Sequence, residues 1–599
     1  MTAAPRDLPP WLPSLVRSLR LGFRAEPRLL VVSFLVTVTA AVPDALFALW
    51  LKLLADGVLG DRPTQVLAAA VALGASAALS WFLQVAGERV GRRFRERATI
   101  VIETHVASLQ ASVASIEHHE RPEYLDRLAV LRDQIFAINH LYASLFGVAG
   151  WVLRLGVTLA LLMSIHPALA VLAVFAAPSV IVASARSAAE RRADERTAPH
   201  YRLARHLFVT GTTAAPGKEV RVAGIADRIA REQRREWERR YDGLAPARWA
   251  TAAWQSAAWA LFGVAYVGAI VFVASGLRAS AGEVLLVVAA GGRLSQYLGQ
   301  TVGEIGFLRG IWLDAARKLA WLEDYAAAAA AGADLPVPAR LERGIRLEGV
   351  SFAYPGTDRL VLEEVDLELP AGAVVAIVGE NGAGKTTLVK LLCRLYEPAR
   401  GRITVDGADL ARLPAEAWRE RVAGAFQDFA RFEFRARQTV GLGDLVRIDD
   451  AEAVAGAVDR AGAGDVVARL RAGLDTQLGP TWREGVDVSY GQWQKLALAR
   501  GFMREHPLLL VLDEPTAALD AESEHALFER YAAAARAPGG AGDGRVTVLV
   551  SHRFSTVRMA DLIVVLDGAR VVEVGTHEAL VARGGQYAQL YAIQAGAYR

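Results

Sequence analysis

The sequence predicts a multidomain protein, in which an all-α membrane domain of six spanning helices is followed by a soluble α/β domain. Long apolar runs alternate with arginine-rich stretches through the first half, and hydrophobic residues make up 53% of the chain, which is high for a soluble protein. Short β-rich runs alternating with helical stretches predict the α/β domain. With 599 residues, the chain is also too long for a single hydrophobic core.

Six segments have the ~20 mostly apolar residues that a spanning helix needs, because lipid offers no water to backbone polar groups. The predicted spans are roughly 29–51, 66–87, 141–164, 168–185, 251–276 and 283–308, and the last is the least apolar. We therefore expect a transmembrane domain over residues 1–325.

Arginine is concentrated on one side of these spans. Arg17, Arg20, Arg24 and Arg28 precede the first span, GERVGRRFRER follows the second, and RSAAERRADERTAPHYR follows the fourth. The loops on the other side, such as DGVLGDRPT and GLRASAGE, carry little charge. By the positive-inside rule we expect a multi-pass protein of the plasma or inner membrane, with both termini and the α/β domain in the cytoplasm.

Charge and cysteine content exclude two classes of protein. The formal net charge of +3 gives no global field that favours nucleic acid, so nucleic acid is not an expected partner. The single cysteine, Cys393, excludes an internal disulfide framework, and we expect it to be a small buried apolar residue.

Residues 326–342, AAAAAAGADLPVPARLE, combine an alanine run with glycine and two prolines, and we predict a linker there. Residues 343–599 then form the α/β domain. Its expected strands include AVVAIVG, LLLVLDE and VTVLVSH.

The stretch GENGAGKTT follows an apolar strand and precedes a helical pattern, so it fits a phosphate-binding P-loop. Glycine lets backbone N–H groups approach phosphate oxygens, Lys385 can reach the β- and γ-phosphates, and Thr386 can bind Mg²⁺. The predicted nucleotide-binding residues are Gly379, Glu380, Asn381, Gly382, Ala383, Gly384, Lys385, Thr386 and Thr387. ATP and Mg²⁺ are the expected ligands of this P-loop NTPase domain.

A second motif supports the first. LLLVLDEPT, residues 508–516, is an apolar strand that ends in two acids, which are costly to bury without a cation. Asp513 suits the Mg²⁺ shell, and Glu514 suits a base that orients water for attack on the γ-phosphate.

With both motifs in place, the chain from about residue 345 resembles the nucleotide-binding domain of an ABC transporter, and residues 1–335 resemble the exporter-type (type IV) membrane domain. The resemblance implies an adenine-stacking role for Tyr354, a Mg²⁺-contacting Q-loop role for Gln427, and catalytic-site roles for Asp520 and His552. It also implies that Ser489, Gly491 and Gln492 contact ATP held on a second subunit.

The signature motif departs from the family pattern L-S-G-G-Q, because Tyr490 stands where glycine is expected. Tyrosine keeps the backbone N–H but adds bulk and a restriction on φ. Three outcomes are open. The signature works with an altered affinity for ATP, or Tyr490 points away and changes nothing. In a heterodimer, the third outcome is that the ATP site that bears the partner's P-loop is weakened.

The resemblance implies a dimer of two half-transporters, identical or different, because ATP binds between two such domains. It further places the two coupling helices at residues 115–128 and 218–229. The alternative for both segments is ordinary solvated helix.

Ionisable side chains inside predicted spans are candidates for a substrate path. Arg293, Gln296, Gln300 and Glu304 share one stripe of the sixth span. Arg154 lies in the third span and Asp44 in the first. The alternative is pairing between helices, for example of Arg154 with an acid.

These observations predict an ATP-hydrolysing exporter that moves a small hydrophobic or amphipathic compound, lipid or peptide by alternating access as a dimer. A first alternative is an importer of exporter shape, as in some siderophore systems. A non-transporting ABC ATPase and a catalytically silent partner are further alternatives. The sequence leaves the substrate, the direction and the identity of the partner subunit open.

Overall fold

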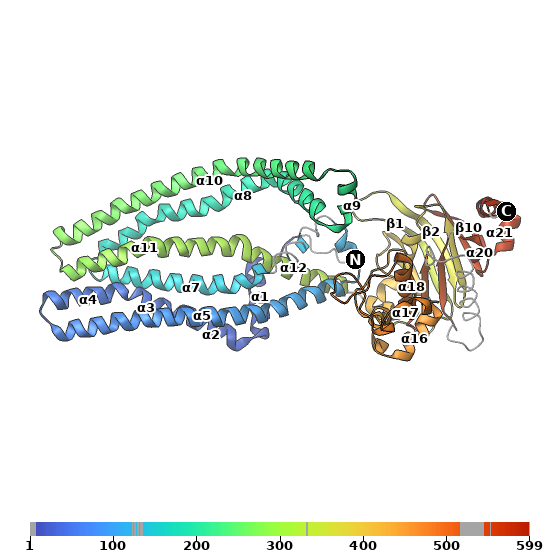
Figure 1. The fold of residues 1–599 in the computed structure, drawn as a ribbon, viewed down its shortest axis with the longest axis horizontal. Helices are drawn as coiled ribbons and strands as arrows, with labels where there is room; N and C mark the ends of the chain where they lie inside the picture. The colour runs from blue at the N-terminus through green and yellow to red at the C-terminus, as the bar shows by residue number, and fades with distance from the viewer. Residues whose placement is uncertain are drawn as a thin grey trace. The chain divides into compact units, whose positions relative to one another are not determined.

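The computed structural model describes residues 7–121, 124, 127–128, 131, 136–330, 333–514, 544–551 and 553–597. They form two compact units. The helical unit consists of Asp7–Ser108 and Leu128–Leu322, and the sheet unit consists of Leu109–Arg127 and Glu323–Arg599. Figure 1 shows the helices of the first unit and the strands of the second.

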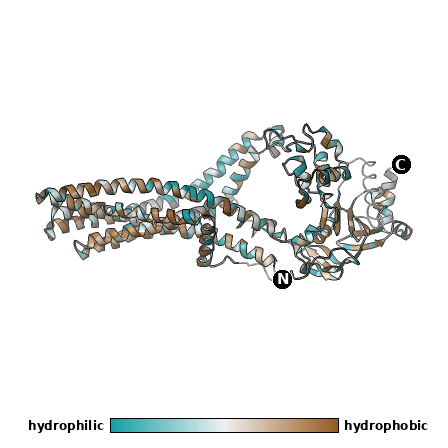
Figure 2. Cartoon of the chain, turned by 90° about the horizontal axis from the view of Figure 1, so that it is seen from below, coloured by the Kyte–Doolittle hydropathy of each residue, from teal (hydrophilic) through white to brown (hydrophobic). Residues whose placement is uncertain are grey.

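The helical unit is built from long helices joined by short turns. Its elements, of which α5 and α12 end with residues assigned to the sheet unit, are α1 (Trp11–Ala25), α2 (Pro27–Thr39), α3 (Ala41–Ala45), α4 (Phe47–Leu59), α5 (Pro63–Ser112), α7 (Phe136–Met163), η2 (Pro167–Ala170), α8 (Val171–Thr212), α9 (Ala214–Val222), α10 (Ala226–Val271), η3 (Phe272–Gly276), α11 (Ala281–Phe307), η4 (Leu308–Trp312) and α12 (Leu313–Ala330). Apolar residues predominate along the bundle in Figure 2, as expected for helices that face lipid.

Among the described residues, four stretches are long and apolar enough to cross a membrane: Pro27–Leu59, Pro63–Ser112, His140–Met163 and Ala226–Gly276. A fifth apolar stretch, Pro167–Val182, is shorter. Helix α11, where the sixth span is predicted, is not among them. It instead buries Leu286, Ala290, Leu294, Tyr297 and Thr301 against its neighbours, which explains how a less apolar helix is accommodated.

The first predicted span is interrupted, because α2, α3 and α4 follow one another with single-residue breaks. Pro43 lies in α3 and has no N–H to bond the preceding turn. The carbonyl of the next residue, Asp44, accepts a hydrogen bond from the Arg293 guanidinium at 3.0 Å. Arg293 of α11 thus bonds the backbone of the interrupted region.

The alanine run assigned to the linker differs from expectation in its first part. Residues up to Ala330 continue α12, because alanine has the highest intrinsic helix propensity. Residues 333–343, which contain Pro336 and Pro338, form no helix or strand.

The sheet unit contains two sheets. A four-stranded antiparallel sheet has the order β2-β1-β4-β5, and a six-stranded sheet has the order β10-β9-β3-β8-β7-β6, parallel except at β10. The strands are β1 (Gly344–Ala353), β2 (Leu360–Pro370), β3 (Val374–Gly379), β4 (Arg400–Val405), β5 (Ala408–Asp409), β6 (Val422–Ala425), β7 (Leu509–Asp513), β8 (Val546–Val550), β9 (Leu562–Asp567) and β10 (Arg570–Gly575). Strand β3 lies between β8 and β9, and β7 lies beside β8. The carboxyl ends of β3 and β7 thus meet at one edge, where ligands of such sheets bind.

Helices cover the parallel sheet and form a helical region between β6 and β7. They are η1 (Glu117–His119), α13 (Lys385–Leu392), η5 (Leu410–Arg412), α14 (Ala415–Glu420), α15 (Ala436–Gly441), η6 (Leu445–Arg447), α16 (Ala451–Arg460), α17 (Gly464–Arg469), η7 (Gly473–Asp475), α18 (Tyr490–Gly501), α20 (Phe554–Val557), α21 (His577–Arg583) and α22 (Gln586–Ala597). One core fills the space between the two sheets, and a second joins α15, α16 and α18 to β6 and β7.

The described residues of Leu109–Arg127, a range that contains most of the first predicted coupling segment, belong to the sheet unit. The N–H of Ile116 donates to the carbonyl of Leu395 at 3.1 Å, and Arg419 donates to the carbonyl of Ala114. Ile116 also packs against the core between the sheets. The second predicted segment falls on α9 and the start of α10 in the helical unit.

Candidate nucleotide site and polar cluster of the helical unit

The P-loop runs from the end of β3 to the start of α13, so the strand–loop–helix order expected from the sequence is present. Gly379 has φ +150°, and a Cβ there would lie 2.2 Å from the carbonyl oxygen of Leu566. Gly384 has φ +101°, and its Cβ would lie 2.7 Å from the carbonyl oxygen of Val361. Both positions therefore require glycine for this loop to close.

Lys385 is the first residue of α13 and is buried. Its ammonium donates to the carbonyls of Gly379 at 2.9 Å and Glu380 at 2.8 Å, so it lies inside the curve of the loop. Burial lowers the pKa of Lys385, while the carboxylates of Glu514 and Asp513 raise it. The loop thus holds a cation where the sequence predicts phosphate contacts.

Asp513 ends β7 and is completely buried. Neither carboxylate oxygen has a hydrogen-bond partner of normal geometry among the described residues, although the nearby Thr386 hydroxyl favours the charged form. Burial raises the pKa of Asp513 to about 6, and Glu514 and Asp428 add to the increase. A buried carboxylate without a donor is stabilised by a cation.

This donor set fits Mg²⁺. The described residues contain no group of three or more His, Cys, Asp and Glu side chains that could hold a metal. Mg²⁺ rarely needs such a group, since it takes one or two protein oxygens and completes its shell with phosphate and water. Asp513 and Thr386 offer such oxygens.

Glu514 follows Asp513 and has φ +46°, a left-handed conformation that is uncommon outside glycine. Its N–H donates to the carbonyl of Val550 at 3.0 Å, and its own carbonyl accepts from the Gln494 side chain at 3.3 Å. Its carboxylate accepts a hydrogen bond from the Gln427 carboxamide at 2.8 Å. Strained residues persist where the surroundings fix them, and these contacts hold the side chain at the edge of the sheet.

Tyr354 lies next to the P-loop helix. Its hydroxyl is 3.0 Å from the Thr387 hydroxyl, and its ring packs edge-on against Phe352 and Tyr396. The Lys390 ammonium lies 5.6 Å from the centre of the Tyr354 ring. Sequence reasoning missed Tyr396 and Lys390, although Lys390 falls one helical turn after Thr386.

The signature residues form the start of α18. Ser489 is the N-cap: its hydroxyl accepts from the N–H of Gln492 at 3.3 Å, and its own N–H donates to the Gln492 side chain at 2.8 Å. Tyr490 and Gly491 are absent from the described residues with positive φ. The expected restriction on φ at Tyr490 therefore imposes no strain, because the position is helical.

Two predicted catalytic residues, Asp520 and His552, lie outside the described residues. The structure brings Lys385, Asp513, Glu514 and Gln427 together at the carboxyl edge of the parallel sheet. It ties Ser489 and Gln492 to each other on α18.

In the helical unit, Asp44 joins two other predicted substrate-path residues, Arg154 and Arg293, into one cluster. The guanidinium of Arg154 donates to one carboxylate oxygen of Asp44 and that of Arg293 to the other, each at 3.0 Å. The Tyr297 hydroxyl donates to Asp44 at 2.9 Å, and Arg154 lies 4.6 Å from the Trp151 ring centre. The pairing of Arg154 with an acid, considered from the sequence, is thus present. Two guanidinium groups share one carboxylate, which leaves excess positive charge.

The other stripe residues lie apart from this cluster. Gln296 and Gln300 are exposed in this chain. Glu304 accepts from the Ser144 hydroxyl at 2.6 Å and lines a pocket of about 230 Å³ with His140 and Trp312. Tyr297 and Ser144 were missed, although Tyr297 follows Arg293 by one helical turn.

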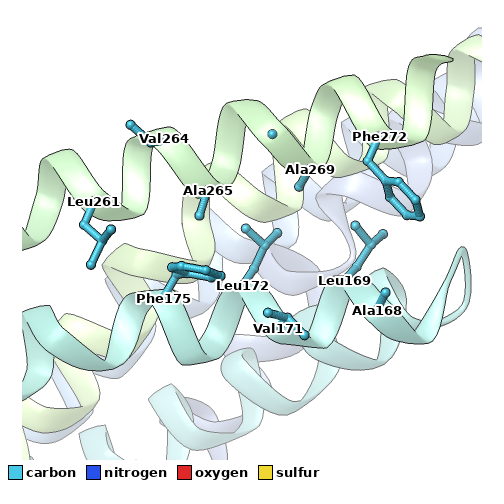
Figure 3. A pocket seen from close by; sticks show the side chains of 11 residues that line it. Ala168, Leu169, Val171, Leu172, Phe175, Leu261, Val264, Ala265, Ala269 and Phe272 are labelled. Atoms are coloured by element: carbon cyan, nitrogen blue, oxygen red, sulfur yellow. The ribbon is translucent and has the colours of Figure 1, made fainter. Parts of the chain in front are cut away.

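An apolar pocket of about 290 Å³ lies between η2–α8 and α10–η3 (Figure 3). Leu169, Leu172 and Phe175 face Ala265 and Ala269 across it, and all its lining residues are apolar. Such a pocket can accept an acyl chain or another apolar group, but it has no side chain that could orient a polar one.

Residues 362–517 match the ABC transporter family. The chain is 39% identical over 258 residues to the ATP-dependent lipid A-core flippase of Chromohalobacter salexigens, which is 43% of this chain and 42% of that protein. It is 34% identical over 247 residues to the nisin transport ATP-binding protein NisT of Lactococcus lactis subsp. lactis, which is 41% of this chain and 40% of that protein. The aligned segments thus span less than half of each relative.

The solved structures add the fold of the whole chain. A bacterial Atm1-family ABC exporter with ATP bound has a TM-score of 0.73 at 24% identity, covering 95% of this chain and 98% of that one. Together with the nucleotide-site residues, these similarities identify residues 362–517 as an ABC transporter domain and show that the chain as a whole has the fold of an exporter half-transporter, in which a helical domain is fused to a nucleotide-binding domain.

Proposed function

We propose that this chain is one half of an ATP-hydrolysing exporter that works as a dimer in a cell membrane. The observation that carries the proposal is the hydrogen bond from Gln427 to the Glu514 carboxylate, beside the buried Lys385 and Asp513. A fixed carboxylate next to a phosphate-binding loop is what orienting water for attack on a phosphoryl group requires.

Each residue has a distinct proposed part. The backbone N–H groups of residues 379–387 and the Lys385 ammonium bind the phosphates, and Tyr354 stacks on adenine. Glu514 orients water, and Gln427 holds its carboxylate in place. Mg²⁺, held by Asp513, Thr386 and Gln427, would neutralise phosphate charge. From the family resemblance, Asp520 and His552 complete the site.

The second subunit follows from the signature residues. Ser489, Gly491 and Gln492 begin α18, and a helix N-terminus attracts phosphate. We propose that they contact ATP bound to the P-loop of a second half-transporter, so that ATP binding joins two subunits and hydrolysis releases them. That partner is a second copy or a different half-transporter.

The proposed substrate is a small hydrophobic or amphipathic compound, a lipid or a peptide. Two named relatives, a lipid A-core flippase and a nisin transport protein, support this breadth. The excess positive charge of Arg154 and Arg293 over Asp44 favours a substrate with an anionic group. Both termini and the nucleotide-binding domain are proposed to lie in the cytoplasm. Export is the proposed direction of transport, and import is the alternative.

The test is ATP hydrolysis by the purified chain in lipid nanodiscs. Wild type should turn over ATP, Glu514→Gln should bind ATP without turnover, and Glu452→Gln, a change at an exposed carboxyl of α16, should match wild type. A folded wild-type chain that binds ATP without turnover would require a different partner subunit. A folded chain that does not bind ATP would contradict the proposal. For an active chain, ATP-dependent uptake into inside-out vesicles would distinguish export from import.

A further inference from the structure

Tyr490, the unexpected residue of the signature, lies against a neighbouring loop. Its ring centre is 5.3 Å from that of Phe429, and the Arg431 guanidinium is 5.4 Å from the centre of the Tyr490 ring. The residue remains 51% exposed, so these contacts cover only part of it. Glycine at this position could make neither contact.

Phe429 and Arg431 belong to a short stretch, residues 427–431, that we name the Gln427 segment. At its start, Gln427 holds the Glu514 carboxylate at 2.8 Å. Phe429 packs against the core that contains Trp493 and Leu496 of α18. The Gln427 segment therefore touches the proposed water-orienting carboxylate at one end and the first residue of α18 at the other.

The rest of α18 also contacts this segment and Glu514. The Arg500 guanidinium, near the end of α18, donates to the carbonyl of Ala430 at 3.3 Å. Gln494, in the middle of the helix, donates to the carbonyl of Glu514 at 3.3 Å. Three side chains of α18 thus contact the Gln427 segment or Glu514, and Tyr490 is the most N-terminal of them.

We propose that Tyr490 is a positioning residue that couples the N-terminal turn of α18 to the Gln427–Glu514 pair of the same chain. The inference rests on the proposed function, in which that turn contacts ATP bound to the partner subunit. A shift of the turn moves the Tyr490 ring, which moves the Gln427 segment and with it the hydrogen bond to Glu514. The tyrosine thereby links the two ATP sites of the dimer.

The first experiment compares Tyr490→Phe with Tyr490→Ala in nanodiscs. Phenylalanine keeps both ring contacts, and alanine removes them without the helix penalty of glycine. We expect Tyr490→Ala to raise the ATP concentration for half-maximal turnover by about three- to tenfold and to reduce cooperativity in ATP, since aromatic and cation–π contacts of this kind are modest. Tyr490→Phe should stay within about twofold of wild type. Adding Arg431→Gln to Tyr490→Ala should change turnover and cooperativity little further, because Arg431 acts through the same contact with the Tyr490 ring.

A second measurement does not require turnover. ATP-dependent protection of the amides of residues 428–431 from hydrogen exchange should occur in wild type and Tyr490→Phe, and should be lost in Tyr490→Ala. Equal protection and equal ATP dependence in all three proteins would overturn the coupling, while Glu514-dependent turnover of wild type would leave the proposed function intact. A wild type that binds ATP without turnover still tests the coupling by exchange. A folded wild type that fails to bind ATP would contradict both.

Discussion

The Gln427 carboxamide donates a hydrogen bond of 2.8 Å to the Glu514 carboxylate, although the two residues are 87 positions apart. Glu514 sits in a strained left-handed conformation at the end of β7, and Gln427 comes from the loop after β6, the neighbouring strand. Adjacent parallel strands thus deliver the two side chains to one edge of the sheet. The bond fixes the direction of a charged group that is expected to act on water.

Removal of this donor should slow hydrolysis more than it weakens binding. Because a hydrogen bond to a charged group contributes about 1.5–3 kcal/mol, we expect Gln427→Leu to lower kcat by roughly ten- to a hundredfold. Gln427→Glu should also lower kcat, since a second carboxylate would repel Glu514. Steady-state turnover and ATP binding measured on the same preparations check this. A loss confined to ATP affinity would contradict the role assigned to Gln427.

Tyr354 should contribute through its ring rather than its hydroxyl. Stacking of an aromatic ring on a base is worth about 1–3 kcal/mol, so Tyr354→Ala should weaken ATP binding by roughly tenfold or more. Tyr354→Phe loses only the 3.0 Å contact with Thr387 and should change affinity about twofold. Inorganic triphosphate, which lacks adenine, provides the control. In competition with ATP it should bind both variants alike, so that only the loss of adenine stacking separates them.

His118 should make the protein less stable in acid. Burial, and then the neighbouring His119, lower the pKa of His118 to about 4. The unfolded chain takes up a proton below pH 6.5, whereas the folded chain does so only below about pH 4. Stability is therefore present above pH 6.5 and is lost as the pH falls between these values. The expected loss from pH 7 to pH 5 is about 2 kcal/mol.

His118→Leu should remove this pH dependence, and His119→Leu should keep it, since His119 is exposed and adjacent. Denaturant unfolding at pH 7 and pH 5 provides the measurement. The same acid loss in both variants would show that groups other than His118 carry it.

Asp44 should stabilise the helical unit. Asp44→Ala leaves the guanidinium groups of Arg154 and Arg293 without their shared carboxylate. Because these side chains are partly exposed, we expect a loss of about 2 kcal/mol, below the cost of breaking a fully buried pair. Glu238→Ala, which breaks an exposed pair with Arg234, should cost less than about 0.5 kcal/mol. Thermal unfolding in detergent compares the two variants. Equal losses of stability would contradict the stabilising role of Asp44.

The strand–loop–helix order around the proposed phosphate-binding loop was predictable because its sequence signals are local. Nine consecutive residues set the loop, and the strand before it and the helix after it follow from apolar patterns. The residues that end β7 were predictable for the same reason. The sequence could also indicate Ser489 as a helix cap, because Ser489 and Gln492 have the spacing of a capping box.

Long-range contacts were beyond the sequence. Nothing local connects Tyr490 to Phe429, or Ile116 to Leu395, because each contact joins segments that only the fold brings together. The sequence allowed two interpretations of Arg154, and its ion pair with Asp44 joins residues 110 positions apart that only the fold brings together. Residues 326–330 were predicted to belong to the linker, because the start of the linker was placed from the glycine and prolines that follow them.

The lengths of α8 and α10 have a mechanical consequence. The two helices contain 42 and 46 residues and lie side by side, joined by α9. At 1.5 Å per residue each is over ~60 Å long, about twice the thickness of the apolar core of a bilayer. A paired rod of this length acts as a lever. If its membrane portion tilts by about 10°, a tip roughly 30 Å beyond the bilayer moves about 5 Å, which is one helical turn. A displacement of that size exchanges one set of side-chain contacts for the next.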